Sequence, residues 1–117
     1  MTLERDPGCV FCKIVAGDVA CEGLYEDDEI LGFKDTSPRA PFHGILIPKT
    51  HIATLDDLKD DQAGTMGRFF LIARDLACRY ELPGYRVVIN TNAAGGQVVF
   101  HIHMHVLGGR QMRGSLG

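Results

Sequence analysis

The segment 98-VVFHIHMHVL-107 constrains the fold more than any other part of the chain, because histidine and apolar residues alternate along it. Successive side chains of a β-strand point to opposite faces of the sheet. A strand over 98–107 therefore has one apolar face that we expect in the core: Phe100, Ile102, Met104 and Val106. The other face carries Val99 and three imidazoles: His101, His103 and His105. A core has no need to desolvate three imidazoles side by side, so the row indicates a chemical role.

Two kinds of chemistry remain open for this row. In the first, histidines two residues apart chelate a metal ion with a third ligand from elsewhere. In the second, one imidazole attacks phosphorus or an acyl carbon while its neighbours move protons and stabilise charge. The preceding loop, 90-NTNAAGGQ-97, favours the second role, because its backbone N–H groups and amide side chains suit phosphate oxygens. The Gly-Gly pair is also compatible with a plain hairpin turn, and no Walker A sequence follows.

The other periodicities predict an α+β fold with a mostly antiparallel sheet in a single domain over residues 1–117. Apolar residues recur at three- and four-residue steps after Asp57, which predicts an amphipathic helix of roughly 20 residues ending near Pro83. Its acidic start suits the positive end of the helix dipole: Asp56, Asp57, Asp60 and Asp61. A short helix is expected over 9–16, stopped by Gly17. Strands are expected over 22–26, 29–34, 44–48, 85–90 and 98–107.

Composition excludes several classes of protein. The formal net charge of −3 indicates no general attraction to nucleic acid or to an anionic membrane. No apolar run is long enough for a transmembrane helix, and the charged start MTLERDPGCVFCK lacks a signal core, so we expect a cytoplasmic location. The four cysteines do not resemble a disulfide framework. Cys9 and Cys12 form a C-x-x-C, which is a metal half-site, a redox pair or two buried thiols.

With these motifs in view, the chain resembles the histidine triad (HIT) family, whose signature of alternating histidine and apolar residues is matched by 101-HIHMHVL-107. Three further stretches are similar to the branch of histidine triad nucleotide-binding (HINT-like) proteins: FCKIVAG, YEDDEILGFKDTSPRAPFHGILIPKTHI and GYRVVINTN…GGQ…FHIHMHVLGGRQM. The resemblance implies a HIT-like α+β fold with one long helix and a short N-terminal helix. It also implies a two-fold homodimer with sheets that continue across the subunits.

The resemblance further implies an enzyme that hydrolyses purine nucleoside 5′-phosphoramidates to nucleoside monophosphates through a nucleotidyl-histidine intermediate. His103 would be the nucleophile, and the His101 carbonyl would hold its other ring nitrogen. His105 would donate to a phosphate oxygen, and His43 would relay a proton to the leaving group. This chemistry needs no metal cofactor. Two alternatives remain, a nucleotide- or zinc-binding regulatory protein with incidental hydrolysis and a dinucleoside polyphosphate hydrolase.

The same resemblance implies a nucleotide site. Asp35 would accept from the ribose hydroxyls, although an Asp before Pro38 also suits a turn. The base would lie among apolar residues that could equally be core: Val10, Phe11, Ile14, Phe33 and Ile45. The phosphate would lie against Asn90, Gly96 and Gln97. The next position usually carries a hydroxyl in this family, whereas here Val98 offers only its backbone N–H, so we expect slower turnover or a shifted leaving-group preference.

Some bacterial members with this C-x-x-C bind zinc, and the matching residues here are Cys9, Cys12, His51 and His101. A Cys₂His₂ set suits a closed, tetrahedral structural site. Two buried thiols and a surface His51 are the alternative. The tail RGSLG lacks the aromatic residue that some members place near the partner's active site, which leaves the leaving-group specificity open.

Overall fold

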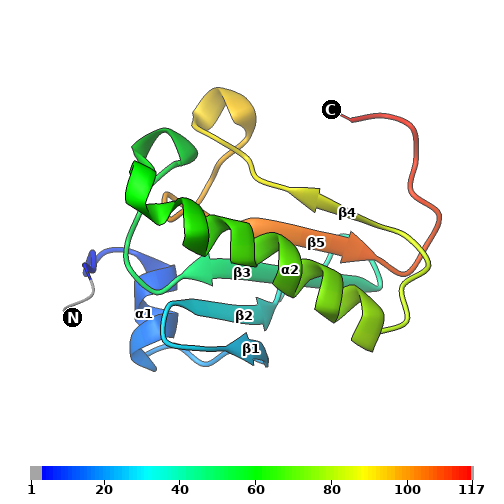
Figure 1. Ribbon diagram of the computed structural model, residues 1–117, viewed down its shortest axis with the longest axis horizontal. Coiled ribbons are helices and arrows are strands. Elements are labelled where there is room, and N and C mark those ends of the chain that lie inside the picture. Colours follow the sequence, from blue (N-terminus) through cyan, green and yellow to red (C-terminus); the bar gives the residue numbers. More distant parts are fainter. Residues whose placement is uncertain (1–3, 117) are drawn as a thin grey trace.

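A computed structural model describes residues 4–116, and its centre is a five-stranded antiparallel sheet in the order β1-β2-β3-β5-β4 (Figure 1). The strands are β1 (Gly23–Glu26), β2 (Ile30–Lys34), β3 (Phe42–Pro48), β4 (Tyr85–Val88) and β5 (Met104–Gly108). The helices are α1 (Val10–Ala16) and α2 (Ala63–Arg79). This arrangement confirms the predicted α+β class with one long and one short helix. Among the described residues, no helix is long and apolar enough to cross a membrane.

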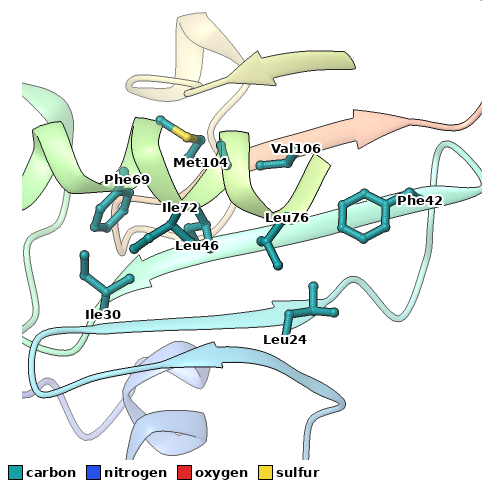
Figure 2. Close-up of a cluster of buried hydrophobic side chains, with 10 residues drawn as sticks. Leu24, Ile30, Phe42, Leu46, Phe69, Ile72, Leu76, Met104 and Val106 are labelled. Atoms are coloured by element: carbon teal, nitrogen blue, oxygen red, sulfur yellow. The ribbon is translucent and has the colours of Figure 1, made fainter. Parts of the chain in front are cut away.

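The central strand β3 is buried along its whole length, because both faces of the sheet are covered. One face packs against α2 through a cluster that Figure 2 shows: Leu24, Ile30, Phe42, Leu46, Phe69, Ile72, Ala73, Leu76, Met104 and Val106. The other face packs against α1 through a second cluster: Cys9, Phe11, Cys12, Leu31, Phe33, Ile45 and Ile47. Alternation along β3 sends Leu46 to the first cluster and its two neighbours to the second.

The short helix α1 ends where its sequence predicts and begins one residue later than the predicted range of 9–16. Cys9 is the N-cap, and its side chain accepts from the backbone N–H of Cys12. Gly17 ends the helix in the left-handed conformation, with φ of 83°, and its N–H donates to the carbonyl of Ile14. Glycine suits this position because it has no Cβ to clash.

The long helix begins later than predicted. Two 3₁₀ turns, Leu55–Asp57 and Asp60–Gln62, precede α2, and the first turn of α2 contains no acidic residue. Local side-chain bonds stabilise these turns: Thr54 Oγ1 donates to Asp57 at 2.8 Å. Such side-chain bonds compete with a continuous helix, and the apolar periodicity alone did not reveal them.

The prediction of a strand over 98–107 was partly wrong, since only Met104–Gly108 pairs with its neighbours. Ile102 leaves the ladder, and its N–H donates to the Ile52 carbonyl at 2.7 Å. Phe100 is 46% exposed and is not part of the core, whereas Ile102, Met104 and Val106 are buried as expected. The strict alternation of faces therefore does not extend through residues 98–103.

Candidate active site

A cavity of about 690 Å³ opens on the α1 side of the sheet. Twelve of the residues expected at the site line it: Val10, Phe11, Ile14, Phe33, Asp35, His43, Ile45, Asn90, Gly96, Val98, His103 and His105. These come from α1, β2 with the residue after it, β3, the 90–98 loop, and β5 with the residue before it. The fold thus brings together segments that are more than 90 residues apart in sequence. The lining is apolar beside α1, and next to it His43, His103 and His105 contribute a row of imidazoles.

His103 is held in one tautomer by its own chain. Its Nδ1 lies 2.7 Å from the His101 carbonyl oxygen, which can only accept, so Nδ1 carries the proton. Nε2 then bears the lone pair. The ring contacts Phe11 edge-on, with 5.1 Å between centroids, and burial lowers the pKa of His103. The imidazole is therefore neutral near pH 7, with a lone pair available for attack.

His43 and His105 form a directed hydrogen-bond chain. The backbone N–H of Arg39 donates to His43 Nδ1 at 3.0 Å, so a neutral His43 carries its proton on Nε2. That Nε2 lies 2.8 Å from His105 Nδ1, which must accept. The remaining proton of His105 is then on Nε2. Burial lowers the pKa of His43, and burial with the neighbouring imidazoles lowers that of His105 to about 4.

Asp35, in the loop between β2 and β3, lies beside His43 in this series of hydrogen-bonded side chains. Its Oδ2 lies 3.4 Å from His43 Nε2, and its Oδ1 accepts from the Ser37 N–H at 2.8 Å. Asp35, His43 and His105 have their ligand atoms within 4.8 Å of one another, which is close enough for a metal ion. However, the backbone donor at Nδ1 keeps a proton on His43 Nε2, so that nitrogen offers no lone pair. The geometry therefore favours proton transfer over metal binding at this trio.

Gln97 does not line the cavity, which differs from its predicted place beside the phosphate. The side chain is 5% exposed, and its Nε2 donates to the carbonyls of Ala53 at 2.7 Å and Val99 at 3.1 Å. Its Oε1 accepts from the Asn92 N–H at 2.8 Å. All of its polar atoms are used inside the protein, so Gln97 supports the shape of the 90–98 loop. The cavity wall is made by Asn90, Gly96 and Val98 instead.

Cys9, Cys12, His51 and His101 converge in a separate cluster next to the cavity. His101 Nδ1 lies 3.4 Å from Cys9 Sγ and 3.6 Å from Cys12 Sγ, and His51 Nδ1 lies 3.3 Å from Cys12 Sγ. Ligands of a tetrahedral zinc ion with Zn–S near 2.3 Å and Zn–N near 2.05 Å are about 3.5 Å apart. His101 Nε2 lies 2.8 Å from the Pro48 carbonyl and donates to it, so the lone pair of Nδ1 faces the thiols. The residues present therefore fit a zinc ion.

Several cavity residues were not identified from the sequence. They are Val19, Ala20, Cys21, Lys34, Thr36, Ser37, Arg39, Val88, Val99 and Leu107. Most are apolar or small and carry no motif. Arg39 had a detectable signal, because it is a cation in the short loop between two predicted site residues, Asp35 and His43.

Comparisons with known proteins identify a family and several similar chains. The family model described as "HIT domain" matches residues 17–112. The purine nucleoside phosphoramidase of Escherichia coli K12 is 39% identical over 105 residues, which cover 88% of each chain. An uncharacterised HIT-like protein of Synechococcus elongatus is 41% identical over 104 residues, covering 88% of this chain and 91% of the relative. The crystal structure of a HIT family hydrolase from Legionella pneumophila superposes with a TM-score of 0.91 at 46% identity, covering 94% of this chain and 100% of that one. A histidine triad protein from Clostridium difficile gives 0.91 at 33% identity, covering 95% and 98%.

Proposed function

Because the chain belongs to the HIT-domain family, we propose that it hydrolyses purine nucleoside 5′-phosphoramidates and releases a nucleoside monophosphate. The relative from Escherichia coli K12 is a purine nucleoside phosphoramidase. The observation that carries the proposal is the tautomer of His103, because the His101 carbonyl holds Nδ1–H and leaves a lone pair on Nε2 at the cavity.

In the first step, His103 Nε2 attacks the α-phosphorus, a new N–P bond forms, and the P–N bond to the leaving amine breaks. The His103 Nδ1 proton stays on the ring, where the His101 carbonyl stabilises the positive charge that develops. The departing amine needs one proton, which His105 Nε2 gives while the His43–His105 pair takes up one proton from solvent, so that neither ring is left as an imidazolate. His105 Nε2–H faces the reacting group and also suits a phosphoryl oxygen.

In the second step, water attacks the nucleotidyl-histidine, the N–P bond breaks, and the monophosphate leaves. The attacking water keeps one hydrogen on the phosphate and releases the other proton to solvent, which balances the proton taken up in the first step, so the net reaction adds one water. In this proposal the base lies beside α1, against Phe11 and Phe33, whose rings contact each other edge-on with 5.6 Å between centroids. Asp35 keeps lone pairs for the ribose hydroxyls, and the backbone of Gly96 and Val98 faces the phosphate.

The test is release of AMP from adenosine 5′-phosphoramidate by wild type, His103→Ala and the exposed control Gln111→Ala. We expect His103→Ala to lose at least about 10³-fold in kcat/KM and the control to match wild type. Mass spectrometry of quenched wild type should detect a nucleotidyl adduct on the peptide with His103. A wild type that leaves the phosphoramidate intact would refute the proposal. Parallel incubation with a dinucleoside polyphosphate tests the alternative hydrolase.

Val98 favours a second candidate function, nucleotide binding with only incidental hydrolysis. Its side chain is 86% exposed at the cavity and has no hydroxyl for the leaving amine. Under this alternative, a nucleoside monophosphate binds in the micromolar range while turnover of the phosphoramidate stays near the uncatalysed rate. Calorimetric titration together with the AMP assay separates the two candidates.

We also propose that Cys9, Cys12, His51 and His101 hold a structural zinc ion. When bound, zinc would link α1 to the segments before and after α2 and so stabilise the fold. Metal analysis of protein purified without chelator or nickel should find about one zinc ion per chain. Cys12→Ser should lower the Tm, whereas Cys78→Ser, at an exposed free cysteine, should leave the Tm unchanged. A metal content near zero would contradict the site. Free thiols persist in a reducing compartment, which supports a cytoplasmic location.

A homodimer is supported by apolar side chains on the surface of α2 and on the edge strand β4. Phe70 and Leu71 are about half exposed, and Tyr85 and Val87 face outward from β4. We expect Phe70→Asp to shift the molecular mass measured by light scattering from two chains to one. Leu55→Asp, at another exposed apolar position, is the control. A monomeric wild type would contradict the proposed dimer.

A further inference from the structure

Arg39 places a positive charge at the imidazole end of the cavity. The residue lies in the short loop between Asp35 and His43, its side chain is exposed, and it lines the cavity. Burial is the main cause of the lowered pKa of both His43 and His105, and the guanidinium adds to it while Asp35 acts in the opposite direction, so Arg39 lies near both rings.

The guanidinium has no partner of its own among residues 4–116. Arg39 uses its backbone, since its N–H donates to His43 and its carbonyl accepts from Arg110 at 3.3 Å. No carboxylate in the described part of the chain lies within 4.0 Å of its side chain, although six other charge pairs are formed there. A second guanidinium, that of Arg110, is bound to the same carbonyl. Asp35 also lines this cavity but pairs with His43, and neither guanidinium forms an ion pair among the described residues, so both keep N–H donors for an anion.

We propose that Arg39 selects substrates whose leaving amine carries a negative charge, a specificity that rests on the proposed phosphoramidate hydrolysis. The end of the cavity that supplies the proton to the departing amine is the end at which Arg39 lies. At Val98 the side chain offers no polar contact to that amine, so recognition by charge takes the place of recognition by a hydroxyl. A guanidinium is suited to this because its planar fork binds a carboxylate or a phosphate through paired N–H donors.

The experiment uses adenosine 5′-phosphoramidates of glycine and of glycinamide, which differ by one negative charge on the leaving amine. Wild type, Arg39→Gln, Arg39→Lys and the exposed control Arg74→Gln on α2 are compared by kcat/KM. We expect Arg39→Gln to lose about fivefold on the glycine substrate and less than twofold on the glycinamide substrate. Arg39→Lys should keep most of the preference, and Arg74→Gln should change neither rate.

The ratio of the two rates is the decisive quantity, because any effect of Arg39 on His43 or on the phosphoryl group acts on both substrates and cancels. Raising the salt concentration to about 0.5 M should also lower the wild-type ratio, which needs no variant. A third substrate, whose leaving amine carries a phosphate, shows whether Arg39 raises kcat/KM more for a phosphate than for a carboxylate. Equal losses on the glycine and glycinamide substrates would overturn the proposal for Arg39. If wild type cleaves neither substrate, the proposed function itself fails.

Discussion

Replacing Gln97 by glutamate separates two roles for this residue, support of the loop and direct contact with phosphate. The substitution Gln97→Glu keeps an oxygen that accepts from the Asn92 N–H but removes both amide donors. The new carboxylate would face the carbonyl oxygens of Ala53 and Val99, which now lie 2.7 Å and 3.1 Å from the amide nitrogen. The side chain is 5% exposed, so water cannot replace the lost donors without a shift of the loop.

The magnitude follows from these contacts. Two lost hydrogen bonds cost about 1 kcal/mol each, and desolvating a carboxylate against two carbonyls adds several more, so we expect a loss of about 3–5 kcal/mol at pH 7.5. Such a loss is a large part of the 5–15 kcal/mol that a domain typically has. Burial raises the pKa of the introduced carboxyl above its unfolded value. Protonation then restores one O–H donor, so the difference from wild type should shrink as the pH falls toward 5.

Urea unfolding of both proteins at pH 7.5 and pH 5 measures this difference, and Gln111→Glu at an exposed position is the matched control. We expect Gln97→Glu to unfold at a clearly lower urea concentration, with the larger shift at pH 7.5, and the control to stay within about 0.5 kcal/mol of wild type. An unchanged midpoint combined with a raised KM would refute the reasoning, because it would mean that Gln97 contacts the substrate.

Three further predictions concern activity, backbone geometry and pH. Val98→Ser should raise kcat for adenosine 5′-phosphoramidate by up to about tenfold, since a hydroxyl can assist the leaving amine; no gain would count against the role given to this position. Gly109→Ala should lower the free energy of unfolding by about 1–3 kcal/mol, because φ is 94° and a Cβ would lie 2.9 Å from Pro41 Cβ. The control Gly95→Ala should lower it much less, because a Cβ there meets nothing within 4 Å. The folded-state pKa of His105 is lowered to about 4, so its contribution to stability is present above pH 6.5 and is lost as the pH falls toward 4. His105→Asn should therefore make the free energy of unfolding, measured with urea, decline less between pH 6.5 and pH 4. An unchanged dependence of this free energy on pH would contradict the prediction.

The sequence predicted those elements whose ends carry a local signal. Gly17 ends α1 as expected, and the acidic turn between β1 and β2 separates two strands where predicted. The errors arose where distant contacts decide the backbone. Alternation over 98–107 suggests a strand, but the N–H of Ile102 bonds to Ile52, a contact between segments 50 residues apart that no local pattern reveals.

The candidate site was predictable by residue type more than by geometry. The motif identified the three histidines, His43 and Asp35, and the fold brings His103, His105, His43 and Asp35 to one cavity. The motif could not reveal that Gln97 turns inward, because an amide side chain suits a phosphate and a buried carbonyl equally well. Arg39 was missed although it lies between Asp35 and His43 in the sequence, because no local pattern shows that its side chain lines the cavity.

The departure of residues 98–103 from the sheet explains how three histidines of one repeat acquire different environments. In a regular ladder the carbonyl of His101 would bond to a neighbouring strand. Because β5 begins only at Met104, that carbonyl is free to accept from His103 Nδ1. The same departure lets the His101 ring reach the two cysteines, while His105, within the ladder, contacts His43 on β3. A continuous strand would present three equivalent imidazoles, and none would have its attacking nitrogen fixed by the backbone two residues before it.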